Sequence, residues 1–120
     1  MHELSLAQNI VSVIHEYVPE DRRSQVETVT VKVGDQAGVV ADSLEFCFSA
    51  IIAGTPLSAA RLSIEHVPFV IACNACNATS SNDTGIMLCD QCGSTETKIL
   101  SGTELQVKEI ELRDQPVETP

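Results

Sequence analysis

The chain has 120 residues, 43% of them hydrophobic and 3% aromatic, and its 7 basic against 17 acidic residues give a formal net charge of −10. This length suits one domain with a small appended module, and the acidic balance argues against nucleic-acid binding, which depends on basic patches. No stretch approaches the roughly 20 apolar residues that span a bilayer, and no basic segment typical of a signal peptide precedes the first apolar residues. We therefore expect a cytoplasmic protein without membrane insertion, whose cysteines bind metal or pack in a core.

The first half of the chain alternates between helical and strand patterns. Residues 4–18 carry apolar side chains at helical spacing and stop at Pro19. Residues 28–33 alternate strictly, which predicts a strand with three valines on one face. A second helix is predicted to begin at Asp42, as its N-cap residue, with Glu45 three positions later. Residues 62–67 alternate again and predict a second strand.

The composition changes after residue 72. Residues 73–97 are rich in Cys, Asn, Ser, Thr and Gly, so this segment cannot build a hydrophobic core of its own. Residues 103–112 predict a last strand, whose alternation slips between Val107 and Ile110 and indicates a bulge or an early end. The order of elements predicts an α+β fold, with two helices on one face of a three-stranded sheet and a zinc-ribbon-like module inserted before the last strand. We expect three segments: an α+β domain of residues 1–70 and 99–113, a metal-binding module of residues 71–98, and a disordered tail of residues 114–120.

Four cysteines form two pairs in the pattern Cys73-x2-Cys76-x12-Cys89-x2-Cys92. Two residues between paired cysteines let both thiolates point at one ion, and two such turns supply the tetrahedral set that zinc prefers in closed structural sites. A four-thiolate iron site for electron transfer and a pair of disulfides are the alternatives. Because four protein ligands leave no open coordination position, we expect no catalysis at this site. The fifth cysteine, Cys47, shares a helix face with apolar residues and is interpreted as a packing residue.

The chain opens with Met1-His2-Glu3, which brings four nitrogen atoms together: the terminal amine, two backbone amides and the His2 imidazole. Consecutive chelate rings hold such nitrogens nearly in a plane, an arrangement that suits Ni(II) or Cu(II) better than zinc. The first amides of a helix have no intrahelical acceptor, so their deprotonation would break no helical hydrogen bond. The alternative is that His2 is simply a solvated terminal residue.

An enzyme is not predicted, because the chain has no Gly-rich phosphate-binding loop and no placeable Ser/His/Asp set. Two other functions remain open on the residues alone. A zinc-ribbon interaction adaptor without nickel transfer would bind a partner regardless of nickel. An electron-transfer protein would carry iron at the four cysteines.

The chain as a whole resembles the HypA/HybF family of hydrogenase nickel-incorporation proteins. The segments that carry the resemblance are "MHELSLA", "VTVKVGDQAGV", "DSLEFCFSAI", "LSIEHVPFVIAC" with the two cysteine pairs, and "GTELQVKEIEL". The resemblance implies nickel binding through His2 with Met1 and Glu3 close by, and zinc binding by the four paired cysteines. It further implies a nickel metallochaperone that delivers Ni(II) to the large subunit of [NiFe]-hydrogenase with a nickel-handling GTPase as partner. Some relatives have histidines flanking the cysteine pairs, whereas this chain has none there, so we expect no pH coupling through such residues.

Overall fold

The computed structural model describes residues 3–113, and the chain divides into two compact units. The α+β unit comprises Met1–Val31, Val39–Ile64 and Val107–Pro120, and the cysteine unit comprises Lys32–Gly38 and Glu65–Gln106. The predicted fold class is confirmed: two helices, a three-stranded sheet, and a cysteine-bearing module before the last strand. The tail expected to be disordered lies outside the described residues.

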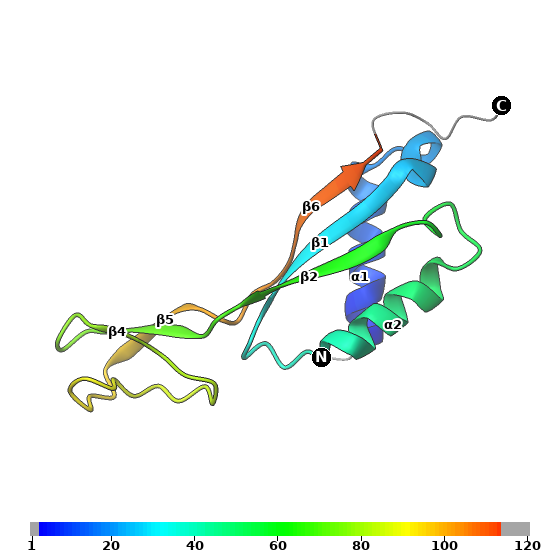
Figure 1. Ribbon diagram of the computed structural model, residues 1–120. Coiled ribbons are helices and arrows are strands. Elements are labelled where there is room, and N and C mark those ends of the chain that lie inside the picture. Colours follow the sequence, from blue (N-terminus) through cyan, green and yellow to red (C-terminus); the bar gives the residue numbers. More distant parts are fainter. Residues whose placement is uncertain (1–2, 114–120) are drawn as a thin grey trace. The chain divides into compact units, whose positions relative to one another are not determined.

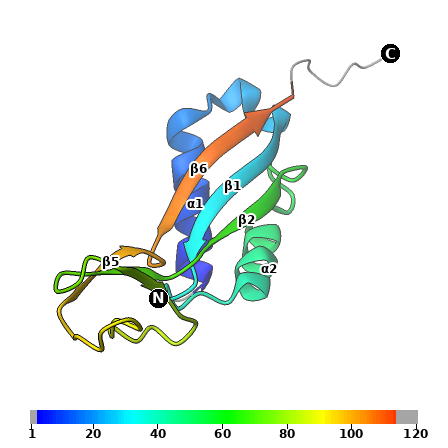
Figure 2. The same ribbon diagram turned by 60° about the vertical axis from the view of Figure 1, so that its left-hand side comes forward.

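Two helices and three long strands carry the α+β architecture. Its elements are α1 (Glu3–Tyr17), the short 3-10 helix η1 (Glu20–Gln25), β1 (Val26–Gly34), α2 (Ala41–Ile52), β2 (Arg61–Val67) and β6 (Leu105–Leu112). The strands form a sheet in the order β2-β1-β6, and both helices lie on one face of it (Figures 1 and 2). Within residues 3–113, no helix is long and apolar enough to cross a membrane.

The core of the α+β unit lies between the helices and the central strand. Val29 and Val31 on β1 are buried in it, and Val33, which belongs to the cysteine unit, is buried as well, as the strict alternation predicted. Helix α1 contributes Leu6, Ala7, Ile10 and Ile14, and α2 contributes Leu44, Phe48 and Ile52. Residues 4–18 were predicted to carry one apolar stripe, but two apolar residues of that range, Leu4 and Tyr17, lie outside the core and are 47% and 72% exposed. Leu4 falls at the margin of a stripe centred on Ala7 and Ile10, and Tyr17 is the last residue of its helix.

The start of α2 differs from the predicted capping box. The helix begins at Ala41, its N-cap residue is Val40, and Asp42 lies in the first turn without capping it. The backbone N–H of Val40 instead donates to Glu3 Oε2 at 3.2 Å. A side chain 37 positions earlier in the sequence thus accepts the N–H of the N-cap residue, the role that Glu45 was expected to play for Asp42. This contact joins the first turns of α1 and α2.

The last strand continues through its irregularity. Lys108 and Glu109 are both exposed, so the alternation of β6 slips where the sequence indicated, yet the strand runs on to Leu112. An early end of this strand was therefore the wrong alternative.

The cysteine unit has its own small antiparallel sheet, which the sequence did not predict. Strand β3 (Val70–Cys73) pairs with β4 (Thr79–Ser81) on one side and with β5 (Thr97–Ser101) on the other. These strands are short, and two of them are mostly polar, so they lack the alternation that marks a longer strand. The register of β3 and β5 shifts between Val70 and Ile71.

Residues 32–38 are held in the cysteine unit by backbone contacts. The N–H of Gly34 donates to the carbonyl of Glu104, and the N–H of Gln36 donates to that of Gly102, both at 2.8 Å. A Cβ at Gly34 would collide with the backbone of Gly102 and Thr103. Only glycine therefore permits this close approach of two chain segments.

Candidate metal centre

Two equivalent turns bring the four paired cysteines together. In the first, Asn77 N–H donates to the carbonyl of Cys73 at 3.0 Å; in the second, Gly93 N–H donates to the carbonyl of Cys89 at 2.9 Å. The residue that follows each pair has a left-handed backbone, with φ of 64° at Asn77 and 75° at Gly93. Glycine adopts this conformation without strain, and asparagine tolerates it better than most residues.

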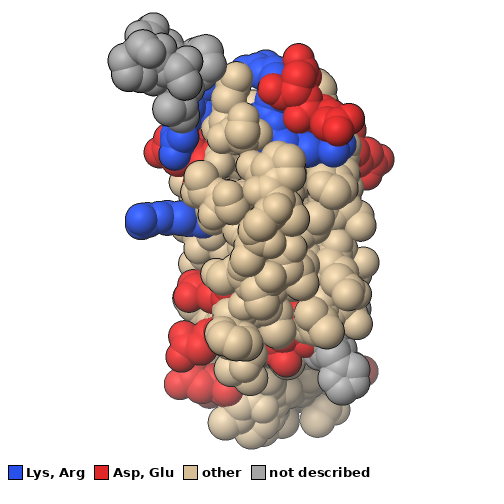
Figure 3. All heavy atoms as spheres, turned by 90° about the vertical axis from the view of Figure 1, so that its right-hand side faces the viewer, with Lys and Arg blue, Asp and Glu red and all other residues tan. Residues whose placement is uncertain are grey.

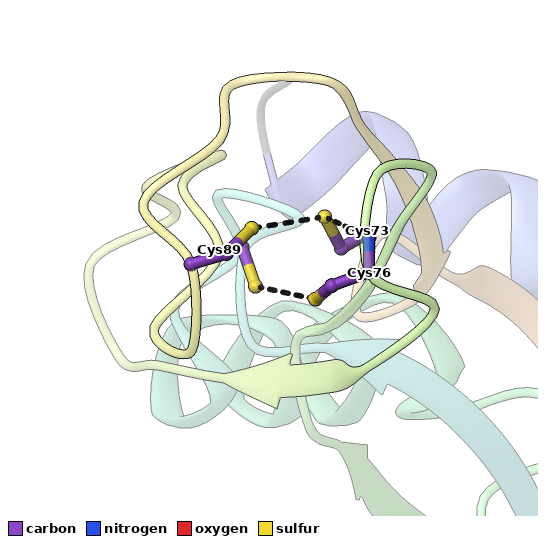
Figure 4. Close-up of side chains that lie close together, drawn as sticks. Cys73, Cys76 and Cys89 are labelled. Atoms are coloured by element: carbon purple, nitrogen blue, oxygen red, sulfur yellow. Dashed lines mark hydrogen bonds between the residues drawn. The ribbon is translucent and has the colours of Figure 1, made fainter.

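The four sulfur atoms form one compact cluster. Cys73 Sγ lies 3.6 Å from Cys92 Sγ, Cys76 Sγ lies 3.6 Å from Cys89 Sγ, and all four lie within 4.8 Å of one another. Figure 4 shows the sulfur atoms of the two turns pointing toward each other. A tetrahedral ion with metal–sulfur bonds of about 2.3 Å requires sulfur separations of about 3.8 Å. The cluster therefore fits one tetrahedral metal ion, and all five cysteines are free rather than joined in disulfides.

Backbone N–H groups favour the thiolate form of the first cysteine in each turn. The Cys92 and Gln91 N–H groups donate to Cys89 Sγ and lower the pKa of that thiol to about 6. The Cys76 and Ala75 N–H groups likewise lower the pKa of Cys73. Both cysteines are buried, at 1% and 3% exposure, so these N–H groups replace the water that would otherwise solvate the negative charge.

The second cysteine of each turn is exposed, and its proton is held more tightly. The Ser94 N–H lowers the pKa of Cys92, but hydrogen bonding with the neighbouring thiols, Cys73 first, outweighs it and raises the pKa to about 12. At Cys76 the Ala78 N–H is likewise outweighed, chiefly by the side chain of Cys89, and the pKa is raised. Four crowded sulfurs thus resist carrying four negative charges together, which a divalent cation would relieve.

A serine on β4 fixes the second turn against the small sheet. The Ser80 hydroxyl donates to Asp90 Oδ1 at 2.8 Å and accepts the Asp90 N–H at 3.3 Å. Ser80 is 7% exposed and lies opposite Ile71 on β3, the strand that leads into Cys73. This pair of hydrogen bonds connects the turn of Cys89 to the strand that pairs with β3.

The connection between the cysteine pairs is ordered by one side chain. Asn82 Oδ1 accepts the backbone N–H groups of Thr84, Gly85 and Ile86 at 3.0, 2.7 and 3.1 Å. Gln36 Nε2 donates to the carbonyl of Asp83 at 2.8 Å, so this loop also contacts residues 32–38. The 12-residue spacer is therefore a folded loop rather than an open tether.

The predicted nickel ligands fall at the edge of what the structure describes. Met1 and His2 lie outside the described residues, and Glu3 is the first residue of α1. Cys47 is half-buried and lies apart from the cysteine cluster. His15 and His66, for which no metal-binding role was predicted, are exposed.

Comparisons with known proteins agree with the metal-handling architecture. The sequence model of the family described as HypA, "Hydrogenase/urease nickel incorporation, metallochaperone", matches residues 1–112. The chain belongs to the HypA family. A hydrogenase maturation factor HypA of Azotobacter chroococcum mcd 1 is 38% identical over 112 residues, covering 93% of this chain and 99% of the relative. One of Geobacter sulfurreducens is 38% identical over 112 residues with the same coverage, 93% and 99%.

Solved structures of the family share the fold. The solution structure of the Ni metallochaperone HypA from Helicobacter pylori superposes with a TM-score of 0.65 at 20% identity, covering 93% of this chain and 97% of that chain. A second solution structure of a HypA protein gives a TM-score of 0.70 at 20% identity, with 96% and 98% covered.

Family membership decides between the functions that the residues left open. The chain is a nickel incorporation metallochaperone of hydrogenase maturation, and it is not an enzyme. The two alternative functions, an adaptor without nickel transfer and an electron-transfer protein, do not match this family. The four-cysteine cluster suggests a zinc site within this chaperone.

Proposed function

We propose that the chain binds Ni(II) at Met1, His2 and Glu3 and delivers it in the cytoplasm to the large subunit of a [NiFe]-hydrogenase, together with a nickel-handling GTPase. Zinc at Cys73, Cys76, Cys89 and Cys92 would hold the cysteine unit together. The observation that carries this proposal is the family match over residues 1–112, which includes both the N-terminal motif and the two cysteine pairs.

The four cysteines suit a resident zinc ion. Zinc supplies a redox-inert tetrahedral crosslink, and four protein thiolates leave no position for a substrate. The backbone N–H donors at Cys73 and Cys89 already favour negative charge on two of the four ligands. Metal analysis of protein purified without chelator should give one zinc per chain. One iron per chain with strong visible absorbance would contradict the assignment.

The proposed nickel site uses the nitrogen atoms of the chain start. Glu3 begins α1, so its backbone N–H belongs to the first turn, where no intrahelical acceptor exists. The Glu3 carboxylate accepts the Val40 N–H, which supports a role for this residue through its backbone nitrogen, with the side chain holding the first turn in place. Protonation of the amides, or exchange with ligands of the receiving protein, would release the ion.

Nickel titration of the untagged chain tests the site. We expect one Ni(II) per chain with the absorption spectrum of a planar nitrogen complex, and loss of this binding in His2→Ala and in N-terminally acetylated protein. Zinc content and circular dichroism should not change in either form, because α1 begins after His2.

His15→Ala is the matched control, since His15 is an exposed histidine on α1. It should bind nickel like the wild type. Unchanged nickel affinity in both N-terminally altered forms would overturn the proposed ligands, as would equal losses in His2→Ala and His15→Ala.

A further inference from the structure

The start of α2 exposes apolar side chains that a folded monomer does not need at its surface. Phe46 is 75% exposed and Val40 is 58% exposed, while Phe48, two positions from Phe46, is buried at 1%. The other exposed residues of α2 are polar or small: Asp42, Ser43, Glu45, Ser49 and Ala50. Phe46 is therefore a single large aromatic side chain exposed on an otherwise polar side of the helix.

Phe46 forms one surface with the first turn of α1. Glu3, Leu4, Asp42, Ser43, Phe46 and Cys47 line a concavity of about 450 Å³. Leu4 is 47% exposed, and Cys47 is half-buried. The Val40–Glu3 hydrogen bond fixes the edge of this concavity, so its walls come from two helices that are already tied together. We call this the α2 surface.

The charged side chains of the two helix segments that line the α2 surface all have the same sign. Residues 1–21 and 33–60 contain no Lys or Arg, so the charged side chains of the first turn of α1 and of all of α2 are acidic. In Figure 3 the Lys and Arg side chains gather in the upper part of the face, and the charged side chains in the lower part are acidic. The α2 surface therefore pairs exposed apolar residues with negative charge.

We propose that the α2 surface docks the protein that exchanges nickel with this chaperone, and that Phe46 inserts into an apolar pocket of that partner bordered by Lys or Arg side chains. This inference rests on the proposed nickel delivery for the identity of the partner. Glu3, one of the proposed nickel ligands, lines the concavity, so a partner seated there would contact that residue directly. Aromatic side chains are enriched at protein interfaces, so the exposed Phe46 is the residue of this surface best suited to anchor a partner.

A second copy of this chain fits the α2 surface poorly. Self-association would bring Asp42 and Glu45 of two copies together, with no basic residue on the same helix to balance them. Each copy also carries a formal net charge of −10, which adds a general repulsion. A different protein with positive charge at the contact would avoid both the local repulsion between carboxylates and the general repulsion between two acidic chains.

The test measures docking separately from nickel binding. Purified maturation GTPase and unprocessed hydrogenase large subunit from the same organism serve as probes, titrated with nickel-free and nickel-loaded chaperone. We expect Phe46→Ala to weaken binding to at least one of them by about 30-fold or more, as for an interface hot spot. Nickel stoichiometry, zinc content and thermal stability should stay at wild-type values, because Phe46 contributes little buried area.

Two matched pairs of variants test whether the Phe46 side chain and the negative charge of the α2 surface act specifically. Tyr17→Ala removes an aromatic residue that is 72% exposed at the other end of α1, and it should bind both probes like the wild type. Asp42→Asn should slow association several-fold at low salt and lose this effect at high salt, whereas Glu16→Gln should not.

Several results would overturn the proposal. They are wild-type binding by Phe46→Ala, equal weakening by Tyr17→Ala, no measurable binding of the wild type to either probe, and a wild-type dimer that Phe46→Ala dissociates in sedimentation. If nickel binding survives His2→Ala while docking still depends on Phe46, the proposed nickel ligands fail and the α2 surface stands. If N-terminal nickel binding is intact but docking does not depend on Phe46, the nickel ligands stand and the α2 surface fails.

Discussion

The two units of this chaperone are held together by different physical means. The α+β unit buries aliphatic and aromatic side chains from both helices and from β1, and it needs no metal ligand for its core. The cysteine unit buries few large apolar side chains, and two of its buried residues are metal-ligand candidates; its buried apolar residues are Val33, Phe69, Ile71, Cys73 and Cys89. One unit is thus stabilised by a hydrophobic core, and we expect the other to depend on its four thiolates and the metal ion they could hold.

The largest expected effect follows from removing one of those thiolates. Structural zinc contributes an apparent free energy of about 10–16 kcal/mol to such modules, more than so small an apolar core can replace. We therefore expect Cys89→Ser to bind zinc far more weakly and to leave the cysteine unit unfolded at micromolar zinc. Amide chemical shifts of residues 65–106 should collapse toward random-coil values, while those of α1 and α2 persist.

Cys47→Ser is the control for this prediction, because Cys47 lies in the α+β unit and outside the cluster. It should keep zinc and both sets of signals. If Cys89→Ser retained a folded cysteine unit without metal, the small sheet would be stable by itself, and the contrast between the two units would be lost.

The next effect concerns the α+β unit alone. Phe48 is 1% exposed on α2, so Phe48→Ala should leave a cavity and cost about 3–5 kcal/mol of unfolding free energy. Urea denaturation followed by circular dichroism measures this loss, and zinc retention by the intact cysteine unit should persist under native conditions. Phe46→Ala, two positions away and exposed, should cost far less. Equal losses in the two variants would show that α2 does not pack as described.

The fold was largely accessible from the sequence because its helices and long strands carry strong periodicity. The strict alternation of residues 28–33 identified the buried face of β1, and residues 4–18 identified α1 to within one residue at each end. The strands β3, β4 and β5 were missed because they are only three to five residues long and owe their pairing to the turns they flank. Local patterns cannot reveal strands whose partners and turns define them.

The sequence predicted the metal ligands of the candidate site, but it did not predict the backbone conformations and hydrogen bonds that hold them in place. The CxxC spacing alone identified the four cysteines that cluster, because two tight turns are a local requirement. Asn77, which takes the same backbone conformation as Gly93, carries no such local signal. The Glu3–Val40 contact joins residues 37 positions apart, and no sequence pattern could distinguish it from the local cap expected at Asp42.

The smallest expected effect comes from removing a hydrogen-bonding side chain that holds one cysteine turn in place. Ser80→Ala removes the hydroxyl that both donates to Asp90 Oδ1 and accepts the Asp90 N–H, so the second turn loses its attachment to β4. Partners that orient metal ligands typically change metal affinity by about 10–100-fold, and we expect the zinc dissociation constant to rise by about tenfold, near the lower end. Competition with a chromophoric chelator measures this change. Ser81→Ala alters an exposed neighbour on the same strand and should leave the dissociation constant unchanged. Equal zinc affinity in the two variants would contradict this prediction. It would mean that the metal ion alone holds the two cysteine turns in place, without help from the Ser80–Asp90 hydrogen bonds.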